Sequence, residues 1–137
     1  MGRSDSTRPV SRQESRKYLT KAKEFLGTAR AALVDSHWNS AGLAAIHAGI
    51  SAADAAIIAS SGLRSSSSDH GAATDLLRIA VPESGATQVR QLTGLLGMKN
   101  EVEYEQRLVT ETEARSLVDQ SDRLVRWAAT VVSAHVD

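Results

Sequence analysis

The sequence predicts an all-α protein, specifically an up-and-down bundle of four or five helices. Apolar residues recur at helical spacing in several long segments, and a complete capping-box signature precedes the longest of them. No segment alternates apolar and polar residues over the length of a strand. With 137 residues, of which 42% are hydrophobic, the chain is long enough to form one domain with its own core.

Composition divides the chain into a leader and a helical domain. Residues 1–11 are rich in serine and arginine and contain no apolar run, so we expect a disordered basic leader. The helical domain is expected over residues 12–137. The chain carries sixteen basic and sixteen acidic residues, and this zero net charge argues against a generally basic nucleic-acid binder. The absence of cysteine excludes disulfides and thiolate chemistry.

The first helix is predicted over residues 12–35, where one face is apolar. That face carries Tyr18, Ala22, Phe25, Leu26, Ala29, Ala32 and Leu33. Turn-forming residues follow, and we expect Asn39 or Ser40 to cap the helix that comes next.

The second helix is predicted over residues 40–60 and is apolar nearly all round. Its many alanine and glycine residues let neighbouring helices approach closely, which predicts a position in the centre of the bundle or in a subunit interface. Gly62 is expected to end it in a left-handed conformation. The apolar run 41–59 approaches membrane-spanning length, but Asp54 lies within it and a central carboxylate is costly in a bilayer. We therefore expect a buried helix and no membrane contact.

Two shorter helices are predicted in the middle of the chain. The third helix is expected over residues 70–81, capped by Asp69 or Ser68 and ended by Pro82. A further helix is predicted over residues 86–96, and Gly94 and Gly97 leave the exact position of its end open.

The last helix has the clearest pattern in the sequence. Thr110 and Glu113 match the capping box, in which each side chain accepts a hydrogen bond from the other residue's backbone amide. Apolar residues then hold one face as far as His135, which predicts a helix roughly 37 Å long at about 1.5 Å per residue.

One candidate site is a polar stripe on the second helix. His47, Ser51 and Asp54 are spaced four and three residues apart, so they share one face. Either they line a cleft as an imidazole and an acid with shifted pKa values, or they are structural groups satisfied by neighbouring helices. The histidines of the chain have no metal-ligand spacing, and hydrolase and nucleotide-binding motifs are absent. We therefore expect no metal and no cofactor.

A second candidate site spans residues 98–105. There Lys99 and Asn100 are suited to contact a phosphate or a carboxylate, and Tyr104 adds a hydroxyl about one turn further on. From Lys99 to Glu113, however, five acids stand against two basic residues, and this local charge of minus three repels a nucleic-acid backbone. The alternative is a solvated acidic corner.

The sequence resembles the HEPN-domain family over about residues 18–132. Short motifs and the order of the helices carry the resemblance. The motifs are Leu95-Leu96-Gly97-Met98-Lys99-Asn100-Glu101-Val102-Glu103-Tyr104-Glu105, Thr110-Glu111-Thr112-Glu113-Ala114, Ala48-Gly49-Ile50-Ser51-Ala52-Ala53-Asp54-Ala55 and the Asp69-His70 start of the third helix.

This resemblance implies a helical bundle that pairs into a homodimer. Active members of the family are metal-independent ribonucleases, often toxins of toxin–antitoxin pairs beside a small nucleotidyltransferase partner. They carry an arginine closely followed by a histidine in a cleft. On this chain the arginine position corresponds to Lys99, the polar residue beside it to Asn100 and the histidine position to Tyr104. The further cleft candidates are His47, Ser51, Asp54 and His70.

Both active-site positions depart from the nuclease pattern. Metal-free RNA cleavage needs a base with a pKa near neutrality, and tyrosine, with an ordinary pKa of about 10, is a poor one. Lysine keeps the charge of arginine but lacks its bidentate fork. We therefore expect a cytoplasmic HEPN-like dimer that binds or regulates another protein and has no ribonuclease activity.

Two alternatives remain open. In the first, the chain is a ribonuclease toxin in which Lys99, Asn100 and Tyr104 rebuild a site with help from His47 or Asp54. In the second, it binds a nucleotide or another small ligand in the cleft between its helices.

Overall fold

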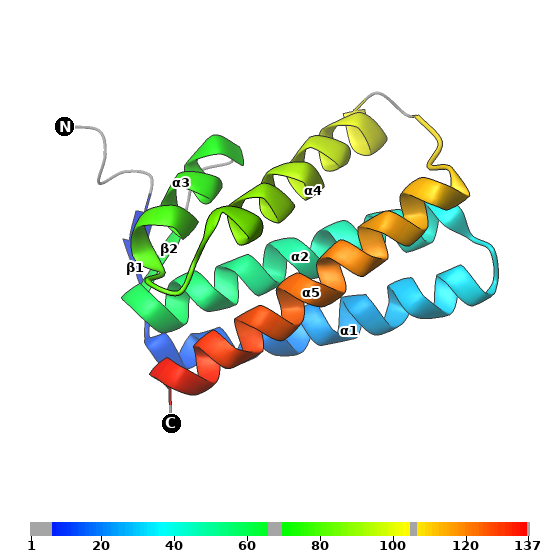
Figure 1. The fold of residues 1–137 in the computed structure, drawn as a ribbon. Helices are drawn as coiled ribbons and strands as arrows, with labels where there is room; N and C mark the ends of the chain where they lie inside the picture. Colours follow the sequence, from blue (N-terminus) through cyan, green and yellow to red (C-terminus); the bar gives the residue numbers. More distant parts are fainter. Residues whose placement is uncertain (1–6, 66–69, 105–106, 137) are drawn as a thin grey trace.

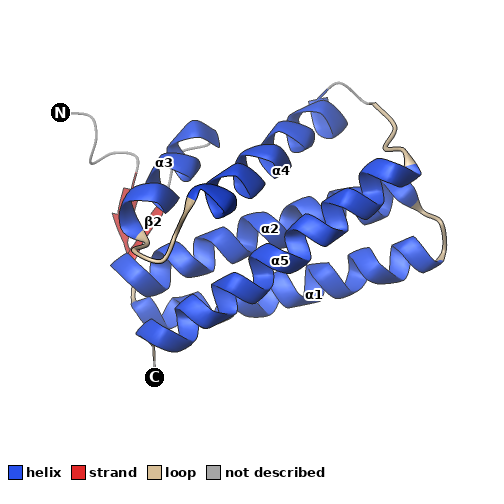
Figure 2. Ribbon diagram, viewed as in Figure 1, coloured by secondary structure: helices blue, strands red, loops and turns tan. Residues whose placement is uncertain are grey.

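The computed structural model describes residues 7–65, 70–104 and 107–136, and at residues 70, 71 and 104 it describes the backbone alone. In chain order its elements are β1 (Thr7–Pro9), the 3-10 helix η2 (Arg12–Glu14), α1 (Ser15–Val34), α2 (Trp38–Ser61), β2 (Leu63–Ser65), α3 (His70–Ala80), α4 (Ala86–Tyr104) and α5 (Glu111–His135). Over these described residues the five α-helices confirm the predicted all-α bundle (Figure 2).

The long helices lie lengthwise beside one another. Figure 1 shows α1, α2 and α5 side by side, with α4 over α2 and α5. Chain direction alternates from α1 to α2 and again from α4 to α5, which confirms the up-and-down arrangement. The shorter α3 packs against α2 and α4 at the end of the bundle where α2 ends.

Helix α2 forms the centre of the core. It contacts each of the other four α-helices, and its alanines are buried on all sides. By length and composition α2 is apolar enough to cross a membrane, yet 78% of its most apolar window is buried inside the bundle. This burial is typical of the core helix of a soluble protein. Of the two positions predicted for this helix, the structure shows the centre of the bundle.

Gly49 on α2 lies directly against α4. A Cβ atom at this position would overlap Cδ1 of Leu95, which is fully buried, and would lie 3.7 Å from Leu124 on α5. A side chain at position 49 would therefore force Leu95 to move at the point where these three helices meet.

The start of α2 differs from the prediction. Its N-cap residue is His37, and no side chain caps it. Asn39 lies one residue inside the helix, and its Oδ1 accepts a hydrogen bond from Val109 N–H at 2.7 Å. The side chain expected to cap α2 instead joins α2 to the loop before α5. Gly62, by contrast, ends α2 with a φ of 69°, as predicted.

Residues 7–11 differ from the expected leader. β1 pairs antiparallel with β2, with Arg8 opposite Arg64, and Val10 N–H donates to the carbonyl of Gly62 at 2.8 Å. The prediction of disorder is therefore wrong for residues 7–11, while residues 1–6 lie outside the described part. Two strands of three residues each are too short to produce an alternating pattern that sequence reasoning would detect.

Helix α4 is longer than predicted. The sequence predicted an end near residue 96, but the helix continues through both internal glycines to Tyr104. An interior glycine costs about 1 kcal/mol relative to alanine, and burial of the leucines on the same helix outweighs that cost. Leu92 and Leu95 are almost fully buried. As a result, Lys99 and Tyr104 belong to one continuous helix.

Helix α5 agrees with its prediction. Thr110 Oγ1 accepts a hydrogen bond from Glu113 N–H at 3.2 Å, and Glu113 Oε1 accepts one from Thr110 N–H at 3.0 Å. Both bonds of the capping box are therefore present. The expected caps of α3, Asp69 and Ser68, lie outside the described residues.

Candidate functional site

The last turns of α4 bring two ionisable side chains close to a histidine on α2. Lys99 and Glu103 are one helical turn apart, and Lys99 Nζ lies 3.0 Å from Glu103 Oε2. The other carboxylate oxygen, Glu103 Oε1, lies 3.6 Å from Nε2 of His47 on α2. The Glu103 carboxylate therefore lies between an imidazole and an ammonium group. We refer to His47, Lys99 and Glu103 as the α2–α4 cluster.

The α2–α4 cluster lies at the surface of the bundle and is partly covered. The His47 side chain is 38% exposed, that of Lys99 is 19% exposed and that of Glu103 is 28% exposed. On its α1 side the His47 ring lies against Phe25, with 5.6 Å between ring centroids. A ligand reaching Lys99 from solvent would therefore meet the carboxylate of Glu103 as well.

A second cation, Arg107, is held by two carboxylates in the loop before α5. Its Nε lies 3.1 Å from Glu101 Oε1, and its Nη1 lies 2.9 Å from Glu113 Oε1. The hydrogen bond from Arg107, with that from the Thr110 backbone, lowers the pKa of Glu113 to about 2. The hydrogen bond to Glu113 in turn raises the pKa of Arg107 above its ordinary value. The predicted acidic corner is thus a set of ion pairs.

Asp54 belongs to a different group of residues. Burial raises the pKa of Asp54 from 3.8 to about 6, and the positive charges of Arg64 and Lys21 offset only part of this rise. Both cations lie over the ring of Tyr18, at 5.3 Å for Arg64 and 5.6 Å for Lys21. Asp54 lies two turns beyond His47, which is about 10 Å along α2. The two ends of the polar stripe, His47 and Asp54, therefore lie in different environments.

The other predicted site residues take varied positions. Ser51 is buried within α2, between His47 and Asp54 in sequence, and Asn100 is exposed on α4. Tyr104 is the last residue of α4 and His70 is the first residue of α3. The side chains of these last two lie outside the described part of the structure.

Comparison with protein-family models and with curated proteins finds no match to this chain. Over residues 7–65, 70–104 and 107–136, no group of three His, Asp or Glu side chains is arranged to hold a metal ion.

Sequence reasoning did not identify Glu103 or Arg107 as site residues. The spacing of Lys99 and Glu103 is a recognisable i, i+4 ion pair, but only if both residues lie on one helix. Because the helix was predicted to end near residue 96, this signal was lost. No local signal joins Glu103 to His47, since that contact depends on how α4 packs over α2.

Proposed function

We propose that this chain is a HEPN-like helical module that binds or regulates another protein, and that it does not cleave RNA. The observation that carries this proposal is the 3.0 Å ion pair between Lys99 Nζ and Glu103 Oε2. Proteins hold RNA largely through cations on its phosphates. At the position corresponding to the family's arginine, the cation is already paired with a carboxylate of its own helix.

Arg107 supports the same conclusion. It is the next cation along the described chain after Lys99, and it contacts both Glu101 and Glu113. A phosphate would have to displace carboxylates from both cations before it gained their attraction. The cost of leaving those carboxylates unpaired beside the incoming phosphate opposes RNA binding at this surface.

The proposed assembly is a cytoplasmic homodimer that engages a nucleotidyltransferase-type protein. Since α2 is buried in its own bundle, a dimer would use other faces of the molecule. Large apolar side chains are exposed on α1, α3 and the loop before α5, namely Val34, Ile79 and Leu108. Light scattering during chromatography should give twice the 14.6 kDa mass of one chain. A monomer over the whole concentration range would contradict the dimer.

RNA binding tests the functional half of the proposal. We expect a fluorescently labelled single-stranded RNA to bind the protein weakly, and Lys99→Ala to leave its anisotropy titration unchanged because Lys99 is paired. Arg123→Ala, on the exposed face of α5, serves as the matched control. Tight binding that is lost specifically in Lys99→Ala would contradict the proposal.

The ribonuclease alternative has one observation in its favour. Glu103 lies 3.6 Å from His47 Nε2, and a carboxylate beside an imidazole is an arrangement that orients a general base. In that case His47, rather than Tyr104, would take the proton from the 2′-hydroxyl. Metal-independent cleavage lost in His47→Ala and retained in His37→Ala would favour this alternative over the binding module.

A further inference from the structure

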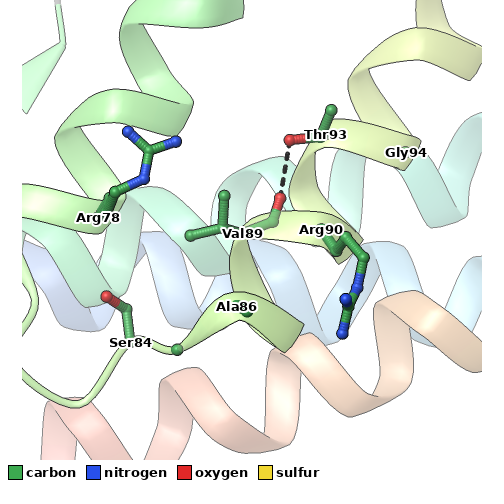
Figure 3. Close-up of a pocket in the computed structure, with 8 residues that line it drawn as sticks. Arg78, Ser84, Ala86, Val89, Arg90, Thr93 and Gly94 are labelled. Atoms are coloured by element: carbon green, nitrogen blue, oxygen red, sulfur yellow. Dashed lines mark hydrogen bonds between the residues drawn. The ribbon is translucent and has the colours of Figure 1, made fainter.

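A cavity of about 700 Å³ lies between the C-terminal end of α3 and the N-terminal half of α4 (Figure 3). Its volume is within the roughly 300–1,000 Å³ typical of small-molecule sites. The cavity is separate from the α2–α4 cluster, since its α4 residues fall within the first half of that helix and Lys99 lies in the second.

The charges of this cavity are of one sign. Arg78 lines it from α3 and Arg90 lines it from α4, and none of the described lining residues is acidic. Arg78 Nη1 lies 3.0 Å from Asp75 Oδ1, but both side chains are more than half exposed, and exposed pairs of this kind are weak. Among the described residues, no carboxylate lies within ion-pair distance of Arg90. The Arg90 guanidinium is therefore open to an anion, and that of Arg78 is held only by this exposed pair with Asp75.

The residues between the two arginines have small, apolar side chains. In Figure 3, Ala86 and Val89 lie between Arg78 on one side and Arg90 on the other. The Thr93 hydroxyl donates to the Val89 carbonyl at 2.8 Å, so its proton is already used within the helix. A ligand spanning the cavity would meet a cation, then an apolar surface, then a second cation.

We infer that this cavity binds a small organic dianion whose two charged groups are joined by an apolar body. One charged group pairs with Arg78 in place of Asp75, the other pairs with Arg90, and the apolar body covers Ala86 and Val89. A guanidinium forms the same two-pronged contact with a carboxylate and with a phosphoryl group. The ligand class is therefore defined by two anionic groups at the ends of an apolar body, whether those groups are carboxylates or phosphoryl groups.

Calorimetric titration of the full chain tests this inference. The probes are decanedioate, decanoate, decane-1,10-bisphosphonate and inorganic phosphate. Decanedioate should bind about tenfold more tightly than decanoate, which is the gain expected from one added charge-assisted pair. The bisphosphonate separates phosphoryl from carboxylate preference, and inorganic phosphate should bind far more weakly than either dianion because it has no apolar body.

Substitution of the two lining arginines tests whether the ligand binds in this cavity. Arg78→Gln and Arg90→Gln should each lower the affinity for decanedioate about tenfold, to the level of decanoate. Arg123→Gln, an exposed arginine paired with Asp119 on α5, should leave it unchanged. Equal affinities for decanedioate and decanoate, no saturable binding of any probe, or binding unaffected by both cavity variants would each overturn the inference. None of these results depends on whether the protein cleaves RNA.

Discussion

The imidazole of His47 and the carboxylate of Glu103 lie 3.6 Å apart, although 56 residues separate them in sequence. The contact exists because α4 continues to Tyr104 and passes over α2. Glu103 also holds Lys99, so the surface that would serve a nuclease is occupied by a carboxylate of the chain itself. This arrangement links the length of one helix to the function that we propose.

The raised pKa of Asp54 should make the free energy of unfolding depend on pH. Its pKa rises from 3.8 in the unfolded chain to about 6 in the folded protein, so the native state binds the proton more tightly. The free energy of unfolding should therefore fall as pH rises from about 4 to 6, by roughly 3 kcal/mol in total for this group. Asp54→Asn is neutral at every pH, so it should be more stable than wild type at pH 7 and lack this fall.

Urea unfolding of wild type and Asp54→Asn at several pH values measures the effect. The difference between the two curves isolates Asp54 from the other titrating groups. Asp119→Asn, an exposed change on α5, is the control and should follow wild type. Parallel curves for wild type and Asp54→Asn between pH 4 and 7 would refute the assignment.

Two glycine variants should have opposite effects on stability. Gly49→Ala places a methyl group against buried Leu95, and overpacking of this kind costs roughly 1–3 kcal/mol. Gly27→Ala lies on the exposed side of α1 with no atom within 4 Å, and should stabilise the protein by about 0.5–1 kcal/mol through helix propensity. Chemical denaturation distinguishes them, and equal stabilisation by both would show that α4 does not approach α2 closely at Gly49.

Asn39 should contribute to stability through a distant residue. Asn39→Ala leaves the buried amide of Val109 without an acceptor, which costs about 1–3 kcal/mol. Asn39→Asp keeps an acceptor oxygen and should lose much less. Thermal unfolding of the pair tests this contact. Similar losses in the two variants would mean that the hydrogen bond to Val109 is not what Asn39 contributes.

Local patterns were sufficient to predict most of the fold. The apolar faces, the Gly62 terminus and the Thr110–Glu113 capping box are set by residues close in sequence, and the structure has each of them. The errors arose where distant contacts decide the outcome. Asn39 bonds across 70 residues instead of capping its own helix, and α4 continues through its glycines because its leucines are buried.

The candidate site was predictable only in part. His47 and Lys99 were both identified from residue type, and the structure places both beside one carboxylate. Their relation through Glu103 needed the packing of α4 on α2, which no sequence spacing encodes. The separation of Asp54 from His47 likewise follows from what surrounds each turn of α2, since helical spacing alone places both on one face.

Cleavage of RNA tests the central claim most directly. Purified protein is incubated with labelled single-stranded and structured RNA in the presence of a metal chelator, alongside Lys99→Ala, His47→Ala and Glu103→Gln, and the products are resolved on a denaturing gel. The binding-module account predicts that wild type and all three variants leave the RNA intact. Cleavage by wild type that disappears in Lys99→Ala or His47→Ala would contradict it.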